Sequence, residues 1–198
     1  MDASELLSRY AMGERKFLRV DMRGADLSGA DLCEVRLICG NLRGINLSNT
    51  YLVRADLGGA DLSGANLSNA NLREANLGDT SLNDANLGGV NLGGAYLSHA
   101  RFWNTVLTEA NLDGANLIEA YMDGVNLDGA TLRDVDLTMA TLNRTTLRRS
   151  NLMGAILSAD TGLGEVDFTG ANLEGVNLFS GAWDKIILPD GKLVVQEG

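Results

Sequence analysis

The sequence predicts an all-β fold, a quadrilateral parallel β-helix of about nine coils with a short N-terminal capping α-helix. Three observations lead to it: hydrophobic residues recur every five positions, small residues recur two places before them, and glycines gather in the two places after them. A period of five fits neither the 3.6-residue helix nor the two-residue strand. Each repeat must therefore combine an extended segment with a corner.

The hydrophobic positions of the repeat run from 17 to 157. Of these 29 positions, 25 are Leu and the rest are Phe or Met. Two places earlier, 16 of 28 positions are Ala, and all but Ile45 are Ala, Gly, Ser, Thr or Val. Residues two apart in an extended segment share a face, so the small residue and the Leu both point inward, while the Asn or Asp between them points outward. Glycine suits the corner that follows because it tolerates positive φ.

Four such sides close a square coil of about 20 residues whose leucines stack along a common axis. Coils one strand spacing apart, ~4.8 Å, give a rod on the order of 40 Å long, with backbone hydrogen bonds running from coil to coil. The β-helix is expected over residues 15–188. One extra residue within 158–162 breaks the phase, so we expect a bulged corner there from which Asp160 and Thr161 project.

Both ends of an open β-helix need a cover. Residues 1–14 are predicted to form a capping helix that starts at Asp2, with Glu5 completing a capping box, and stops at Gly13; its apolar residues at helical spacing are Leu6, Leu7, Tyr10 and Ala11. At the other end, Trp183 takes a central position and residues 189–198 form a cap or tail, in which Pro-Asp-Gly turns the chain in a hairpin or final half-coil. The alternative for these apolar ends is an end-to-end contact, so a monomer or a weak end-to-end dimer is expected.

The composition excludes several function classes. The formal net charge of −10 disfavours direct nucleic-acid binding, which depends on Lys and Arg. A single His and two Cys disfavour a metal site, and a filled Leu/Ala rod offers no pocket for catalysis or for a cofactor, so we expect no enzyme. No signal segment or membrane-length apolar run is visible, and a cytoplasmic protein without membrane contact, with Cys33 and Cys39 as free thiols, is expected.

A partner protein is expected to bind one flank of the rod, and the densest departure from short polar residues marks a candidate. This aromatic patch consists of Tyr96, His99, Arg101, Trp103 and Tyr121, all outward by register. Tyr121 follows Arg101 by 20 residues, so the guanidinium is expected to stack on its ring. The alternative is local repacking around the large inward residues Phe102 and Met122.

Two charged features accompany the patch. His99 lies in a column between Asp79 and Glu119, which predicts a surface charge pair with both carboxylates rather than a metal site. Residues 109–136 carry seven acids against one Arg, a local charge of −6. We call the first five of these acids the acidic flank; they are Glu109, Asp113, Glu119, Asp123 and Asp128.

The repeats Ala-Asp-Leu-Ser-Gly, Ala-Asn-Leu-Ser-Asn and Ala-Asn-Leu-Asp-Gly resemble the pentapeptide-repeat proteins, and the resemblance covers nearly all of residues 15–188. It implies a right-handed coil. The segments at the two ends are similar to cyanobacterial members, including those linked to regulation of heterocyst differentiation, which implies a cytoplasmic, non-catalytic binding scaffold with a regulatory role.

The period and the negative charge are also similar to the quinolone-resistance members of this family. That likeness implies an alternative function, mimicry of a DNA duplex toward a type II topoisomerase through the acidic flank. The chain departs from those members because it has no long apolar C-terminal helix, and because Arg144, Arg148 and Arg149 interrupt the acidic residues.

Overall fold

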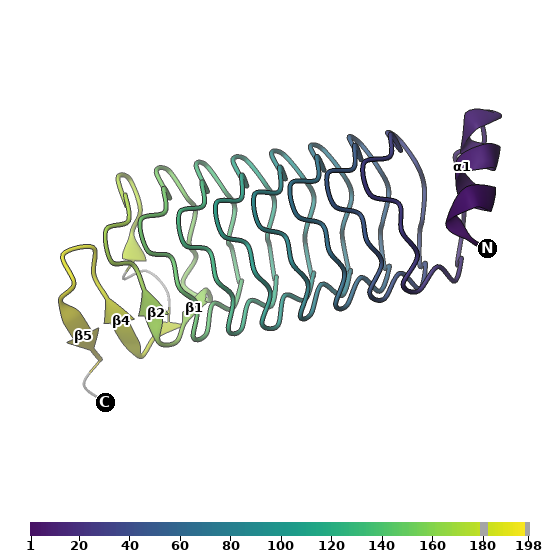
Figure 1. The fold of residues 1–198 in the computed structure, drawn as a ribbon. Helices are drawn as coiled ribbons and strands as arrows, with labels where there is room; N and C mark the ends of the chain where they lie inside the picture. Colours follow the sequence, from purple (N-terminus) through teal and green to yellow (C-terminus); the bar gives the residue numbers. More distant parts are fainter. Residues whose placement is uncertain (179–181, 197–198) are drawn as a thin grey trace.

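The computed structural model describes residues 1–178 and 182–196, and the chain winds through them as a rod of stacked coils (Figure 1). Each coil pairs with the next through parallel bridges between residues 20 apart, such as Lys16 with Arg36 and Asp21 with Asn41. Because bridged residues also recur every five positions, the bridges form four columns, one for each side of the coil. The predicted parallel stacking with a 20-residue turn is confirmed.

The sides of the coil are too short to form continuous strands. From residue 16 to residue 156, each side contributes a single isolated bridge residue and no continuous strand. The reason is geometric: the corner takes two of every five residues, which leaves only three in extended conformation. Among residues 1–178 and 182–196, continuous strands occur only near the C-terminal end.

Within one repeat, residues 65–69, every backbone N–H has an acceptor. Ala65 donates to Leu62 across the preceding corner (2.9 Å), and Asn66 donates to the coil before (2.9 Å). Leu67 and Asn69 donate to the coil after, at 2.7 and 2.9 Å. The fifth, the N–H of Ser68, donates to the side-chain Oδ1 of Asn66 (3.1 Å). The recurrent Asn or Asp before each Leu is therefore structural, because it accepts the N–H that the coils leave unpaired.

The corners are turns in which the second residue after the Leu has positive φ, as at Gly64 (φ 67°) and Asn69 (φ 56°). Positive φ at this one turn position, together with the hydrogen bond across the corner, defines a type II turn. The sequence predicted glycine for this geometry, yet Arg, Glu, Met and His adopt it elsewhere, since 18 of the described residues other than Gly have positive φ.

The core is the column of inward residues. The Leu residues from Leu27 to Leu152 are fully or almost fully buried, and Phe102 and Met122 fill the same positions at 0% exposure, as predicted. Small inward residues pack beside them. Buried hydroxyls in these positions also have acceptors: Thr80 Oγ1 donates to the Leu77 carbonyl at 2.6 Å.

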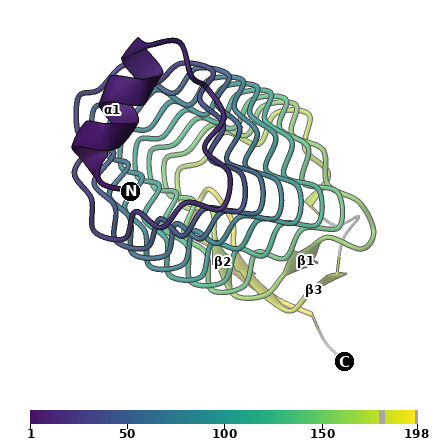
Figure 2. The same ribbon diagram turned by 90° about the vertical axis from the view of Figure 1, so that its right-hand side faces the viewer.

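The N-terminal cap is helix α1, Ala3–Ala11, which lies across the first coil (Figure 2). Asp2 is the N-cap and accepts the N–H of Glu5 at 2.8 Å, as predicted. The helix stops at Gly13 (φ 95°) in a Schellman arrangement. Of the four predicted contact residues, Leu6 is buried and Tyr10 packs on the core, but Leu7 and Ala11 face outward.

The phase break is confirmed by the bridges that cross it, from Thr141 to Asn151, which join residues 21 apart, such as Thr141 with Gly162. Asp160 is exposed, but the expectation that Thr161 projects is wrong: Thr161 is fully buried and donates to the Leu137 carbonyl at 2.9 Å. Its hydroxyl also accepts the N–H of Ser158 (2.9 Å), so this side chain closes the enlarged corner around itself.

The C-terminal end carries the continuous strands. They are β1 (Gly162–Leu163), β2 (Val166–Asp167), β3 (Ala182–Trp183), β4 (Lys185–Ile187) and β5 (Leu193–Val195). β3 pairs parallel with β1, and β4 pairs parallel with β2, as a last partial coil. β5 then folds back antiparallel on β4, so the predicted half-coil and hairpin are both present (Figure 1). Residues 197–198 of the predicted tail lie outside the described residues.

Candidate functional site

The five residues of the aromatic patch lie on two sides of the rod and on the corner between them. Arg101 and Tyr121 are successive bridge residues of one column, and Trp103 lies two residues after Arg101 on the same side, which we call the Trp103 face. Tyr96 belongs to the neighbouring column, bridged to Asn76 and Asn116. His99 occupies the corner between these two sides, with φ 60°.

The Trp103 face contains a shallow hollow of about 310 Å³ lined by Asn83, Arg101, Trp103, Tyr121 and Asp123. Both rings are well exposed, Trp103 by 49% and Tyr121 by 57%. The structure thus brings together three of the five predicted patch residues. It adds Asn83, which sequence reasoning missed, and Asp123, which was assigned to the acidic flank. The signal was available, because positions 83, 103 and 123 are spaced by one coil.

Asn83 has a definite structural role in the hollow. Arg101 replaces the Asn or Asp that would normally accept the N–H two residues later, and the Trp103 N–H donates instead to Asn83 Oδ1 in the preceding coil, at 3.0 Å. Asn83 therefore fixes the backbone of Trp103 although this repeat has no Asn or Asp of its own to accept the N–H. The Arg101 side chain takes no part in forming the corner.

The charges in the hollow are unequally paired. Asp123 binds the Arg144 guanidinium through both oxygens, at 2.9 and 2.7 Å, and this pairing raises the pKa of Arg144. Within residues 1–178 and 182–196, the ion pairs do not include Arg101. In the hollow, Asp123 therefore has an ion-pair partner, whereas Arg101 has none among the described residues.

The predicted stacking of Arg101 on Tyr121 is wrong. The two residues are bridge partners on adjacent coils, but in the described chain the cations over rings are Arg9 over Phe17 and Arg15 over Tyr10. Bridge register brings the two backbones one strand spacing apart and does not fix where a long side chain lies. The ring and the guanidinium line the same hollow without stacking.

His99 makes one of its two predicted charge pairs. Its Nδ1 lies 3.4 Å from Glu119 Oε2 in the next coil, and both side chains are exposed. Asp79 is not an ion-pair partner of His99 in the part of the chain that the structure describes. An exposed pair of this kind contributes little to stability, on the order of 1 kcal/mol or less.

The acidic flank does not lie on one flank. Asp113, Asp123 and Asp128 follow the bridge residues of three different columns, and Glu119 and Glu109 occupy corners, so the five acids encircle the rod. A run of consecutive residues must do so, because one coil takes only 20 residues. The expectation of a continuous acidic face is corrected accordingly.

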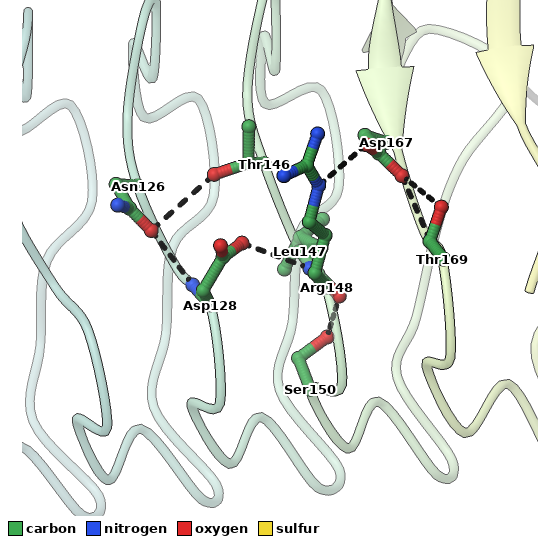
Figure 3. A network of polar contacts seen from close by, with 8 residues as sticks. All are labelled: Asn126, Asp128, Thr146, Leu147, Arg148, Ser150, Asp167 and Thr169. Atoms are coloured by element: carbon green, nitrogen blue, oxygen red, sulfur yellow. Dashed lines mark hydrogen bonds and ion pairs between the residues drawn. The ribbon is translucent and has the colours of Figure 1, made fainter.

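Two of these acids are structural acceptors. Asp113 Oδ1 accepts the N–H of Arg133 at 2.9 Å, and Asp128 Oδ1 accepts the N–H of Arg148 at 3.0 Å (Figure 3). In both cases the next coil has Thr where Asn or Asp would accept this N–H, so the acceptor comes from the coil before. The same arrangement joins Asn83 and Trp103. These carboxylates help to connect successive coils.

Arg148 also links coils through its side chain, which donates to Asp167 at 2.7 Å (Figure 3). Thr169 donates to the other oxygen of this carboxylate from its backbone N–H (2.9 Å) and its hydroxyl (2.6 Å). Burial raises the pKa of Asp167, but the hydrogen bonds from Thr169 and Arg148 outweigh it and hold that pKa below the usual value.

Tyr96 borders a separate hollow of about 480 Å³ on the adjacent side, together with Ile38, Cys39 and a floor of glycines. A Cβ on Gly78 would lie 2.7 Å from Tyr96 Cε1, so the ring rests directly over this glycine. Cys39 is an exposed free thiol, and Cys33 is free and half-buried. Burial raises the pKa of Cys33, which keeps it in the thiol form.

Two further features are absent from residues 1–178 and 182–196. No group of three or more His, Cys, Asp or Glu side chains is arranged to hold a metal ion. No helix in this part of the chain has the length and apolar character needed to cross a membrane.

Comparison with solved structures places two proteins beside this one. HetL from the cyanobacterium Nostoc sp. strain PCC 7120, a pentapeptide repeat protein involved in heterocyst differentiation regulation, is 28% identical with a TM-score of 0.55, over 98% of this chain and 100% of that one. A trypsin-treated QnrB1, a plasmid-mediated fluoroquinolone resistance protein, is 19% identical with a TM-score of 0.50, over 85% of this chain and 81% of that one. The second likeness shows the fold alone.

No curated protein matches the chain. A family model does: the model for pentapeptide repeats matches residues 16–52, 50–89, 85–124 and 120–158, which is most of the coil region. These residues contain the five-residue period, the inward Leu column and the bridges between coils. The chain belongs to the pentapeptide-repeat family.

Proposed function

We propose that this chain is a non-catalytic scaffold with a regulatory role, a right-handed quadrilateral β-helix of about nine coils that binds a partner protein through the Trp103 face. One observation carries the proposal: the hollow that joins Arg101, Trp103 and Tyr121 on a rod whose outward residues are mostly short and polar. Trp, Tyr and Arg dominate the energetics of protein interfaces. HetL, the similar cyanobacterial protein, is involved in regulation, which supports a regulatory role here.

The shape of the rod favours this use. Successive coils are joined by backbone hydrogen bonds on every side, which makes the surface rigid. A partner that binds the Trp103 face therefore does not lose free energy in ordering that surface. The surrounding outward residues, such as Ser81 and Thr141, are short, and the two rings project beyond them.

Affinity capture from native lysate tests the proposal. The baits are the wild-type chain, the double variant Arg101→Ala/Trp103→Ala, and two matched single variants, Tyr121→Ala and Tyr51→Ala. Tyr51 is as exposed as Tyr121, 56% against 57%, but belongs to a different column. The proposal predicts a partner that survives high-salt washing, is lost from the double variant and from Tyr121→Ala, and is retained by Tyr51→Ala. A partner retained by all four baits would refute it.

Mimicry of duplex DNA through the acidic flank ranks below this proposal. The acids encircle the rod, and four of the five are engaged locally: Glu119 by His99, Asp123 by Arg144, and Asp113 and Asp128 by backbone N–H groups. The same lysate experiment separates the two functions. A basic partner lost in high salt, lost on combined Asp113→Asn and Asp128→Asn substitution and indifferent to Trp103→Ala would bring mimicry to first place. Asn retains the acceptor oxygen, so these changes remove charge alone.

We further propose that the chain acts in the cytoplasm as a monomer or a weak end-to-end dimer. Two free thiols suit a reducing compartment, which supports the location. Helix α1 covers one end and β5 extends the other, which supports a capped rod. Light scattering at increasing concentration tests the second point.

A further inference from the structure

We infer that the hollow on the Trp103 face recognises a single carboxylate, an Asp or Glu side chain that a partner protein presents next to an apolar residue. This inference rests on the proposed function and specifies the chemistry of the partner.

The lining of the hollow carries one cation, Arg101, and one anion, Asp123, and of the two only Asp123 has an ion-pair partner among the described residues. Asp123 is held through both oxygens by Arg144, whereas the Arg101 guanidinium has no carboxylate partner among the ion pairs of the described residues. Arg144, which lies beside the hollow, compensates the charge of Asp123, so Arg101 is left as the uncompensated charge of the lining, on a chain with a formal net charge of −10. A planar guanidinium pairs with a carboxylate through two parallel hydrogen bonds, so an acidic side chain satisfies it best.

The walls of the hollow add an apolar contact. Trp103 and Tyr121 line it from successive coils, half exposed, and their rings can cover the methylene groups of an acidic residue and the side chain beside it. Covering the carboxylate with two rings lowers the local dielectric and strengthens its pairing with Arg101. A volume of about 310 Å³ suits one or two side chains, not a folded domain.

Carboxylates at the two corners of the Trp103 face disfavour polyanions. Asp84 and Glu119 occupy the two corners that flank the Trp103 face, and Glu119 lies there 3.4 Å from His99 Nδ1. One carboxylate that reaches Arg101 between the rings meets the positive centre, whereas a nucleic acid or a doubly charged phosphate also meets these carboxylates. One excess positive charge therefore favours a singly charged group.

Arg144 has a specific part in this arrangement. While Arg144 holds Asp123 through both oxygens, it compensates the charge of that carboxylate and weakens the attraction of Asp123 for Arg101. Removing Arg144, which lies on the corner at φ 50°, frees Asp123 to compete with the partner's carboxylate. The hollow thus depends on a positioning residue outside its lining.

The test is selection of random 16-residue peptides displayed on phage against the full wild-type chain, followed by fluorescence polarisation with the enriched peptides. We expect enriched peptides that share one Asp or Glu beside Pro, an aliphatic or an aromatic residue. Replacing that acid by its amide should weaken binding about ten- to hundredfold, the range of a hydrogen bond to a charged group. Arg101→Gln and Arg144→Ala should weaken binding to the acidic peptide but leave binding to its amide version unchanged, and Tyr51→Ala should change neither.

The outcomes separate the inference from the proposed function. Peptides that need Trp103 but bind equally as acid or amide, and equally to Arg101→Gln, would overturn the carboxylate while leaving the binding face intact. Peptides that bind Trp103→Ala as tightly as wild type would overturn the face itself. Far-ultraviolet circular dichroism of each variant establishes that it is folded before either conclusion is drawn.

Discussion

Substituting Gly114 by Ala should destabilise the rod through the backbone alone. Gly114 is a corner residue with φ 66°, and a Cβ built on it meets nothing within 4 Å, so no steric clash adds to the effect. An L-residue in the left-handed region costs about 1–2 kcal/mol. The smaller conformational freedom of Ala in the unfolded chain returns about 0.4–1 kcal/mol.

The net loss is therefore about 1 kcal/mol, which lowers Tm by about 2–4 °C for a chain of this size. Thermal unfolding followed by circular dichroism measures it. Gly93→Ala is the matched control, because Gly93 lies at a corner without positive φ and its added Cβ would touch the Asn91 side chain at 3.3 Å. We expect its Tm to change by no more than about 1 °C.

The reverse substitution completes the test. Met139 is an exposed corner residue with φ 59°, so Met139→Gly relieves the left-handed strain at the expense of added freedom in the unfolded chain, and Tm should rise. If Gly114→Ala lowered Tm no more than Gly93→Ala, and Met139→Gly lowered it as well, the assignment of these corners to positive-φ turns would be refuted.

Three further substitutions test the core, the enlarged corner and the ion pair near the C-terminal end. Leu117→Ala should lower the free energy of unfolding in urea by about 2–5 kcal/mol, and Leu117→Asp should abolish the single cooperative transition; an unchanged melting curve would show that Leu117 is not inward. Thr161→Val should lower it by about 1–2 kcal/mol, because the Leu137 carbonyl loses its hydroxyl donor; no change would mean that the enlarged corner does not depend on this bond. Since hydrogen bonds hold the pKa of Asp167 below its usual value, its stabilisation is complete above about pH 4 and is lost as pH falls through the lowered pKa. The stability difference between wild type and Asp167→Asn should therefore shrink in acid, and a difference undiminished at about pH 2 would contradict the argument.

The fold was predictable because the five-residue period reports directly on the core. Leu, the small residue before it and the 20-residue coil follow from which side chains share a face, and the buried Leu column confirms them. The phase break near residue 160 was equally predictable from a count of residues. Thr161 was not, because its burial depends on a carbonyl of Leu137 in the preceding coil rather than on the local sequence.

Backbone hydrogen bonding was the main omission of the sequence interpretation. It placed the Asn and Asp before each Leu on the surface without seeing that they accept an N–H at the corner, as Asn66 does. The same omission made Asp113 and Asp128 look like free surface charge, although each accepts an N–H from the next coil. The number of charged residues can be counted from the sequence. Whether a carboxylate accepts a backbone N–H depends on whether the next coil has its own Asn or Asp before the Leu.

The candidate site was predicted in part. Register brought Arg101, Trp103 and Tyr121 to one face, and the same arithmetic at a spacing of 20 would have added Asn83 and Asp123. Register could not predict that Arg144 binds Asp123 while Arg101 is in none of the ion pairs of the described residues. A long side chain can reach neighbours in several coils, and the sequence does not show which one it binds.

Photocrosslinking in living cells shows whether the Trp103 face binds a protein. A benzophenone amino acid is placed at position 121, at the edge of the hollow, and in a separate variant at position 51, where Tyr51 is equally exposed on another column. The account predicts a discrete crosslinked product of higher mass from position 121 and none from position 51. Products from position 51 alone, or the same products from both positions, would contradict it.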